Sequence, residues 1–345
     1  MIGMLLHYKC PSCGGNMGFD VDTGALLCPN CGCEENIETY DEGYIEQIFD
    51  QDEAVEYRCD NCGGTVLTDQ DTAATSCSFC GAGVVMGDRV TGKLAPAQVI
   101  PFSIGKEEAQ ATFKKWSKSG RFTPKSFALD NRIENITGMY VPYFIYDLHA
   151  KVNLDGIGTR VSSYRRGDYV YTETKYYRVV RDFDLFYNKV PVDASEKMQD
   201  DIMDKVEPFH YADLKVFKTP YLAGYLAEKY SHDAKALFGR IQSKVYPYAN
   251  GYLQNTLRGY ATITDRNENI ETKEKKNKYV LFPIWLVSYD YEHEKHTIVM
   301  NGQTGKIVGK LPLSFSKMAI WTAGITAASF SVMKIVGFLA GGVWW

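Results

Sequence analysis

The sequence predicts two small zinc ribbons, each a metal-stabilised β unit, followed by an α+β domain and a C-terminal transmembrane helix. Three observations predict this order: a repeated cysteine pattern near the N-terminus, mixed helical and strand patterns in the middle, and a long apolar tail. The expected boundaries are zinc ribbon 7–36, acidic linker 37–55, zinc ribbon 56–88, α+β domain 93–312 and membrane anchor helix 318–345.

The overall composition is that of an ordinary globular protein. The 345 residues are 45% hydrophobic and 23% charged, and the 24 Tyr and 17 Phe favour strands over disorder. The net charge of −4 gives no overall positive field to attract nucleic acid. The first six residues are apolar but lack the basic region and the length of a signal peptide. We therefore expect a cytoplasmic N-terminus, where thiols stay reduced and cysteines point to metal before disulfides.

Eight of the nine cysteines form CxxC pairs in two sets, and the second set repeats the first 49 residues later, as Cys59 repeats Cys10. Two such pairs aim four thiolates at one ion and complete the tetrahedral shell that Zn²⁺ prefers. Units this small bury little apolar surface, so the metal supplies most of their folding free energy. A shell of four thiolates leaves no open position for a substrate, which favours a structural role. The predicted ligands of two Zn²⁺ ions are Cys10, Cys13, Cys28, Cys31, Cys59, Cys62, Cys77 and Cys80.

Redox-active CxxC pairs and an iron–sulfur cluster are the alternatives to zinc. A thioredoxin-type pair lies at a strand–helix junction of a larger fold, which the pattern here does not predict. Thiolate sites can also hold iron. Cys33 is the cysteine left over, and it is either a bystander or a competitor of Cys31 for the metal.

Many zinc ribbons bind nucleic acid, and the charge pattern argues against that role here. A zinc ion with four thiolates carries a net charge of about −2. The stretch 38–56 between the ribbons is acidic and contains no Lys or Arg, and it would repel phosphates. The basic residues of the ribbons are Lys9, Arg58 and Arg89. A nucleic-acid-binding zinc-ribbon protein is therefore the alternative hypothesis.

The middle of the chain predicts three helices among several strands. We expect Ser103 to cap a helix that continues through Lys118, Ser195 to open the second helix, and Ser231 to precede the third, which has apolar residues at helical spacing as far as Val245. The basic run 273–278 is interpreted as a solvated loop, and Asn301-Gly302 as a hairpin turn. The segments Val141–Ile145 and Phe282–Leu286 resemble each other. The expected strands are 139–153, 168–177, 178–190, 279–292 and 296–300, with a turn at 165–167.

The same region contains no recognisable catalytic pattern. No Gly-rich phosphate loop, GxSxG elbow or paired His–acid motif is present. His293 and His296 flank Glu294 and Lys295, which is not the HExxH spacing of a metalloprotease, and a strand would point the two histidines to opposite faces. We therefore predict no catalytic residues and no enzyme activity.

The tail from Met318 to Trp345 has one charged residue, Lys334. Its length suffices to cross about 30 Å of hydrocarbon, and Trp321 and Trp344 suit the two interfacial belts. Lys306, Lys310 and Lys317 precede the tail and no basic residue follows it, so the positive-inside rule places the bulk of the protein in the cytoplasm. Lys334 near mid-span costs about 2.5–3.5 kcal/mol unless it is paired or reaches water. The alternative is a tail that lies in the membrane interface.

With these motifs the chain resembles the bacterial TFIIB-type zinc ribbon-containing membrane protein family, of the kind encoded beside PspA-like and SPFH-like proteins. The resemblance covers most of the chain and depends on motifs in every part of it. These are Cys10–Gly15, Ile100–Phe102, Gly138–Pro142, Pro191–Ser195, Glu207–Phe209, Tyr221–Gly224 and Asn301–Lys306.

The resemblance implies a role in envelope stress, in which a membrane platform recruits PspA-like or SPFH-like proteins. Ribbons plus an anchor without a catalytic pattern indicate a non-enzymatic adaptor that acts through protein–protein contacts at the cytoplasmic membrane. A homo-oligomer is also compatible with the sequence. An enzyme with an unrecognised site in the α+β domain is a third hypothesis.

Overall fold

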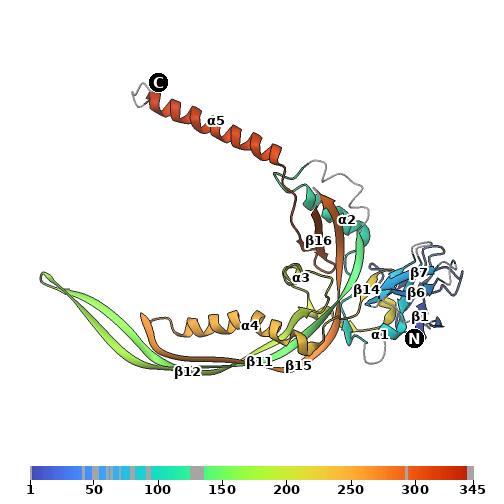
Figure 1. Cartoon of the computed structure of the whole chain (residues 1–345), viewed down its shortest axis with the longest axis horizontal. Helices are drawn as coiled ribbons and strands as arrows, with labels where there is room; N and C mark the ends of the chain where they lie inside the picture. The colour runs from blue at the N-terminus through green and yellow to red at the C-terminus, as the bar shows by residue number, and fades with distance from the viewer. Residues whose placement is uncertain are drawn as a thin grey trace.

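The computed structural model describes residues 2–40, 43–48, 54–59, 62, 65–69, 71–77, 82–90, 95–124, 136–291 and 294–339. Its shape is that of a fork (Figure 1). A long curved arm and a separate C-terminal helix extend from one side of a central body, and the cysteine-containing N-terminal region lies on the other side.

Two cysteine units form the N-terminal region. The first unit, residues 7–36, folds around the three-stranded antiparallel sheet of β2 (Gly18–Phe19), β3 (Leu26–Leu27) and β4 (Glu34–Glu35). The second unit, residues 56–88, contains the hairpin of β6 (Ala54–Arg58) and β7 (Thr65–Asp69) and the hairpin of β8 (Thr72–Ser76) and β9 (Gly83–Met86), followed by α1 (Gly87–Val90).

The second cysteine unit is continuous with the sheet of the body. In the described residues this sheet follows the order β13-β10-β15-β11-β14-β8-β9-β1-β5, with β12 on β11, and β16 and β17 beyond β15. The predicted linker 37–55 therefore holds a strand of its own, β5. The bounds not yet given are β1 (Ile2–His7), β5 (Gly43–Ile48), β10 (Gln98–Val99), β11 (Thr137–Arg166), β12 (Tyr169–Asp193), β13 (Lys215–Val216), β14 (Leu226–Glu228), β15 (Thr262–Tyr291), β16 (Glu294–Asn301) and β17 (Ile307–Val308).

The three predicted helices are present; Ser231 precedes the third as expected, but the first two begin after Ser103 and Ser195, which do not cap them. Gly105, Gln199 and Asp233 are the N-caps. The Ser195 hydroxyl donates instead to the buried Glu228 carboxylate at 2.8 Å, and the Asp233 carboxylate caps its helix by accepting from the backbone N–H of Ala236. The helices are α2 (Lys106–Ser117), α3 (Asp200–Val206), α4 (Ala234–Thr256), α5 (Phe315–Leu339) and the 3₁₀ helices η4 (Tyr211–Asp213) and η5 (Thr219–Leu222).

The arm consists of the outer parts of β11, β12 and β15, with α4 along one face (Figure 1). The register of β11 with β12 runs without a shift from Leu148↔Tyr187 to Arg166↔Tyr169, so the two strands predicted at 168–177 and 178–190 are one. The interpretation of 273–278 as a loop was wrong, since these residues lie in β15 and pair with β11. Lys273, Glu274, Lys275 and Lys276 are all exposed, so both faces of β15 are solvated over this stretch.

The body core lies between the central strands and the surrounding helices. The two similar segments of the sequence are neighbours in it, because Val141 pairs with Phe282 in the antiparallel register of β11 and β15. The Trp285 indole N–H donates to the carbonyl of Ile104 at 3.0 Å. Asn301 turns the chain from β16 into β17, as predicted, and its side-chain carbonyl accepts from the backbone N–H groups of Gln303 and Thr304, each at 2.9 Å.

Candidate metal centres

Two tight turns position the four sulfurs of the first cysteine unit. In each turn the backbone folds back on the first cysteine: Gly14 N–H donates to the Cys10 carbonyl at 2.8 Å, and Gly32 N–H donates to the Cys28 carbonyl at 2.9 Å. Gly14 and Gly32 have φ angles of 70° and 73°, a left-handed conformation that favours glycine. The CxxC spacing and the following glycine therefore fix the turn locally.

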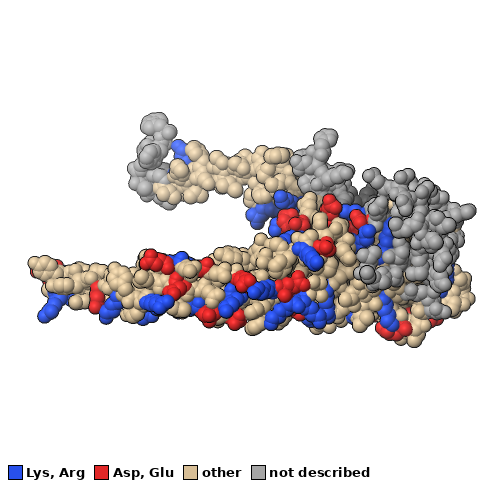
Figure 2. Space-filling model, turned by 60° about the horizontal axis from the view of Figure 1, so that its bottom comes forward, with Lys and Arg blue, Asp and Glu red and all other residues tan. Residues whose placement is uncertain are grey.

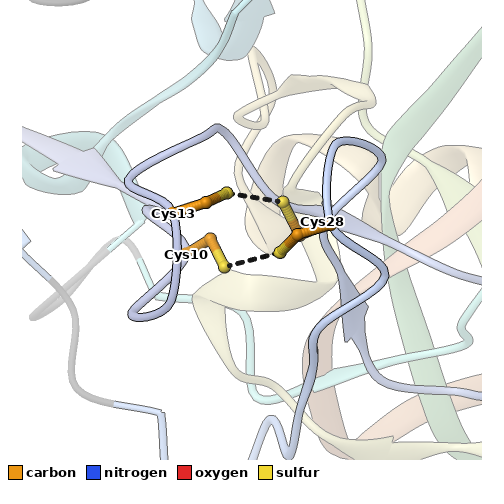
Figure 3. A group of neighbouring side chains, drawn as sticks. Cys10, Cys13 and Cys28 are labelled. Atoms are coloured by element: carbon orange, nitrogen blue, oxygen red, sulfur yellow. Dashed lines mark hydrogen bonds between the residues drawn. The ribbon is translucent and has the colours of Figure 1, made fainter.

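The four sulfurs face one another across the two turns (Figure 3). The Sγ atoms of Cys10 and Cys31 are 3.5 Å apart, those of Cys13 and Cys28 are also 3.5 Å apart, and all four lie within 4.8 Å of one another. Zn–S bonds of about 2.3 Å in a tetrahedron place sulfurs about 3.8 Å apart. The spacing therefore fits a single tetrahedral ion.

The four thiols of the first unit influence one another's ionisation. Burial acts to raise the pKa of Cys10, but hydrogen bonds from the backbone of Cys13 and Ser12 and from Cys31 outweigh it and lower that pKa to about 6. A backbone hydrogen bond from Cys33 acts to lower the pKa of Cys31, yet the neighbouring thiols Cys10 and Cys13 raise it to about 12. Four thiolates so close together repel one another, and a bound metal ion supplies the compensating charge.

The second cysteine unit repeats this arrangement. Cys59, Cys62 and Cys77 lie within 4.8 Å of one another, and the Sγ atoms of Cys62 and Cys77 are 3.7 Å apart. In both units the first cysteine of each described CxxC pair is buried and the second is exposed, except that Cys80, predicted as the fourth ligand, lies outside the described residues. Both groups of residues could therefore hold a metal ion.

Cys33 lies beside the first cluster without joining it. Its Sγ is 3.5 Å from the Ser12 hydroxyl and 3.8 Å from a carboxylate oxygen of Glu35. The sulfurs that converge are those of Cys10, Cys13, Cys28 and Cys31. The sequence left open whether Cys33 competes with Cys31 as a ligand, and Cys31 is the one within the cluster.

The first cluster is embedded in the contact between its unit and the body. Cys10 and Cys28 belong to the same buried cluster as Phe19 and Tyr221, whose rings meet edge to face with centroids 5.4 Å apart. The Phe19 N–H donates to the Ala223 carbonyl at 2.9 Å, and Lys218 pairs with Glu38. A metal at the first site therefore orders residues that the body packs against.

At the opposite end, α5 is the one described helix that is long and apolar enough to cross a membrane, over Phe315–Val336. None of that segment is buried, and it is almost free of charge (Figure 2). Trp321 contacts the body, with its ring 6.4 Å from that of Phe122 and the Arg121 guanidinium 5.2 Å above it. Lys334 lies over the ring of Phe330, and Trp344 lies outside the described residues.

Sequence reasoning missed a buried group of charges between β12, α3 and α4. Asp193 is 1% exposed, and its carboxylate is 2.7 Å from the Arg240 guanidinium, which also pairs with Asp200 and Asp204. Burial raises the pKa of Asp193 to about 6, with Arg240 acting in the opposite direction. These residues are far apart in the sequence, and no spacing rule could have joined them. Every member is paired inside the protein, so the group is interpreted as structural.

No protein-family model matches the chain. No solved structure matches it. The chain is 51% identical over 339 residues to the uncharacterized protein YdjG of Bacillus subtilis (strain 168), an alignment that covers 98% of this chain and 99% of that protein. Identity at this level over nearly the full length of both proteins means that the chain belongs to the same family as YdjG.

Proposed function

We propose that this protein is a non-enzymatic, membrane-anchored adaptor whose two zinc ribbons present binding surfaces to protein partners. The observation that carries the proposal is the separation of two thiolate clusters from an apolar helix by the whole body of the protein (Figure 1). One end has the properties of an anchor and the other those of small, rigid recognition units.

Zinc is the metal that fits the clusters best. Four thiolates at tetrahedral spacing are typical of structural zinc sites, whose closed shell leaves no position for a substrate. Iron can bind similar ligands, but the cytoplasmic location and the small size of the units favour a redox-inert ion with a folding role. Each filled site carries a charge of about −2, which repels phosphate and disfavours nucleic acid.

The anchor proposal depends on α5 and the residues around it. Its apolar surface is exposed on all sides, which is stable in hydrocarbon and unfavourable in water. Lys306, Lys310 and Lys317 stand just before or at its start, so the body would lie in the cytoplasm. Both cysteine units would then face reducing conditions that keep their thiols available for metal.

The proposed partners come from the resemblance stated for the sequence. A family encoded beside PspA-like and SPFH-like proteins suggests that one of these docks on the ribbons during envelope stress. Both ribbons contact the body, the first through Phe19 and Tyr221 and the second through the pairing of β8 with β14. The second is the better candidate for this docking, because Cys59 and Cys77 lie in a small core of their own, whereas Cys10 and Cys28 share the core of the body.

The test is crosslinked purification of the full chain from membranes, followed by mass spectrometry. We expect a PspA-like or SPFH-like protein to co-purify, and Cys59→Ser or Cys62→Ser to remove it while Cys33→Ser does not. Unchanged capture by the Cys59 and Cys62 variants would exclude the second ribbon as the docking surface. Recovery of DNA or RNA from a soluble fraction would favour the nucleic-acid hypothesis instead.

A further inference from the structure

The outer end of the arm is a two-stranded ribbon with no third strand beside it. β15 begins opposite Thr159, with the pair Thr159↔Thr262, whereas β11 and β12 continue as seven further pairs to Arg166↔Tyr169. We call residues 160–175 the arm tip. A two-stranded ribbon alone is marginally stable in water, so the arm tip would gain stability from a partner that covers it.

The two faces of the arm are distinguished by α4. Val152, Leu154 and Val179 pack against Ala249 and Leu253 of the helix. Because side chains alternate along a strand and the register has no shift here, the residues between these positions point the other way. We call that side of β11 and β12 the outer face.

The outer face carries a row of exposed apolar side chains that no described element covers. Their exposed fractions are high for apolar residues, and the ion pair of Arg178 with Asp155 and the hydrogen-bonded pair of Ser163 with Thr172 lie between them on the same face. Apolar side chains gathered on one face within a polar surround are typical of interaction sites. The row consists of Ile157 (38%), Val161 (51%), Val170 (69%), Tyr176 (71%) and Val180 (52%).

On the side of α4, by contrast, the aromatic residues of the ribbon contact one another. Tyr164 and Tyr171 stack with centroids 5.6 Å apart, and Arg160 lies over the rings of Tyr177 and Tyr260. The outer face is therefore the side of the ribbon that lacks partners of its own for its apolar side chains.

We propose that the outer face is a homodimer interface, on which the arm of a second copy of this chain docks face to face and antiparallel. The reciprocal burial of the two apolar rows would supply the support that the arm tip lacks. A two-fold axis near Thr159 and Tyr176 places Tyr176 of each copy against its counterpart and makes the contact closed and symmetric.

The charges on the outer face determine both the partner and its direction. Arg165 is exposed toward the hairpin end, and the exposed Asp182 lies toward the body. Between them Arg178 pairs with the half-buried Asp155 at 2.8 Å on the same face, which leaves Arg165 and Asp182 as the charges that face a second copy. In the antiparallel arrangement, Arg165 of one copy lies over Asn153 of the other copy. Asn153 pairs with Asp182 of its own chain, so Arg165 of the first copy lies close to that carboxylate. A parallel arrangement would set Arg165 over Arg165 and Asp182 over Asp182. Like charges so close together are unfavourable.

The arm is also neutral enough to approach another arm. On the face of the arm that Figure 2 shows, acidic and basic side chains are interspersed without a large patch of one sign. The arm tip has four basic and two acidic residues, and the acidic positions Asp155, Asp182 and Asp184 lie closer to the body. The proposed dimer depends neither on metal bound at the cysteine clusters nor on which protein docks on the ribbons.

Photocrosslinking of the purified full chain in mixed detergent–lipid micelles tests the contact directly, because the antiparallel contact directs the two α5 helices in opposite directions, which one flat bilayer does not accommodate (Figure 1). With p-benzoylphenylalanine in place of Tyr176, we expect a crosslinked species of twice the chain mass of 38.9 kDa. The matched control is the same substitution at Tyr164, which is 56% exposed but lies on the face toward α4, and it should give little dimer. An adduct of Tyr176 with lipid alone would overturn the proposal in favour of membrane contact.

A charge exchange tests the direction of docking without touching the apolar row. Arg165→Glu and Asp182→Arg should each reduce the dimer fraction at least several-fold in light scattering of the purified full chain, and the double variant should restore it. Far-UV circular dichroism and metal content should stay the same. A wild-type chain that is monomeric throughout, or a double variant no more dimeric than the single ones, would overturn the proposal.

Discussion

Cys31 and Cys33 are two thiols separated by one residue, and only their surroundings distinguish them. Cys31 converges with three other sulfurs, whereas Cys33 contacts Ser12 and Glu35. A thiolate is a strong ligand for zinc only when its geometry allows it to complete the shell. Position in the fold, rather than chemistry, separates the ligand from the bystander.

Cys31→Ser should therefore lower the metal content of the purified chain from two ions to one, because a site with three thiolates holds zinc much less tightly. Cys33→Ser should leave two ions bound. Inductively coupled plasma mass spectrometry of the dialysed proteins measures this directly. Equal metal contents in the two variants would contradict the assignment of Cys31.

Asp193 and Arg240 show how a buried charge depends on its partner. Burial raises the pKa of Asp193 from 3.8 to about 6, and Arg240 limits this rise. A carboxyl group with a raised pKa binds its proton more tightly in the folded state, so its contribution to stability falls as the pH rises from about 4 to about 6.

Arg240→Met should lower the free energy of unfolding by about 3–5 kcal/mol at pH 8, because it leaves the buried Asp193 carboxylate without its partner. The loss should be smaller at pH 5, where a protonated Asp193 no longer needs a counterion. Urea unfolding at the two pH values measures the difference. The control is Lys205→Met, whose exposed pair with Asp201 contributes about 0–1 kcal/mol. A loss that is independent of pH would argue against this account.

At the scale of elements, the arm is stabilised by a helix laid along a sheet. α4 buries Ala249, Leu253 and Leu257 against Val152 and Val179 of the strands. Long strands with solvated outer faces have no core of their own. The contact between α4 and the strands, which we call the seam, must therefore supply most of the apolar burial of the arm.

Leu253→Ala should cost about 2–5 kcal/mol, since the side chain is fully buried and the seam can collapse only in part. Hydrogen exchange should accelerate in the arm strands and less in the body. Tyr248→Ala is the control on the same helix: its side chain is 70% exposed, and the change should be within about 0.5 kcal/mol. Equal effects of the two substitutions would show that the seam does not hold the arm.

At the scale of the whole molecule, the fork connects a metal-binding end, an arm and an apolar helix through one sheet. β8 of the second cysteine unit pairs with β14, which pairs with β11, and β11 runs on into the arm. α5 joins this body through the contacts of Trp321 with Arg121 and Phe122. If α5 spans a membrane, the whole body is held at its surface.

Ile325→Asp should therefore move the full chain from the membrane pellet into the supernatant of a carbonate extraction. Ile325 is 60% exposed on α5, and a carboxylate there costs about 2.5–3.5 kcal/mol in a bilayer. Ile325→Leu should remain in the pellet. Retention of the Asp variant in the pellet would mean that α5 is not the anchor.

The sequence by itself determined the features that depend on neighbouring residues. The CxxC turns of the first cysteine unit, the Asn301 turn and the apolar run of α5 each follow from short-range geometry or composition. The two kinds of turn lie where they were predicted, and α5 begins at Phe315, before the predicted start at Met318, with residues 340–345 of the predicted helix outside the described residues. The tertiary structure decided the rest. The 30 residues of β11 form one strand only because β12 and β15 pair with them, and the charged run 273–278 is extended for the same reason. The ion pair of Asp193 with Arg240 and the apolar outer face likewise arise from contacts between distant segments, whose free energy no local pattern records.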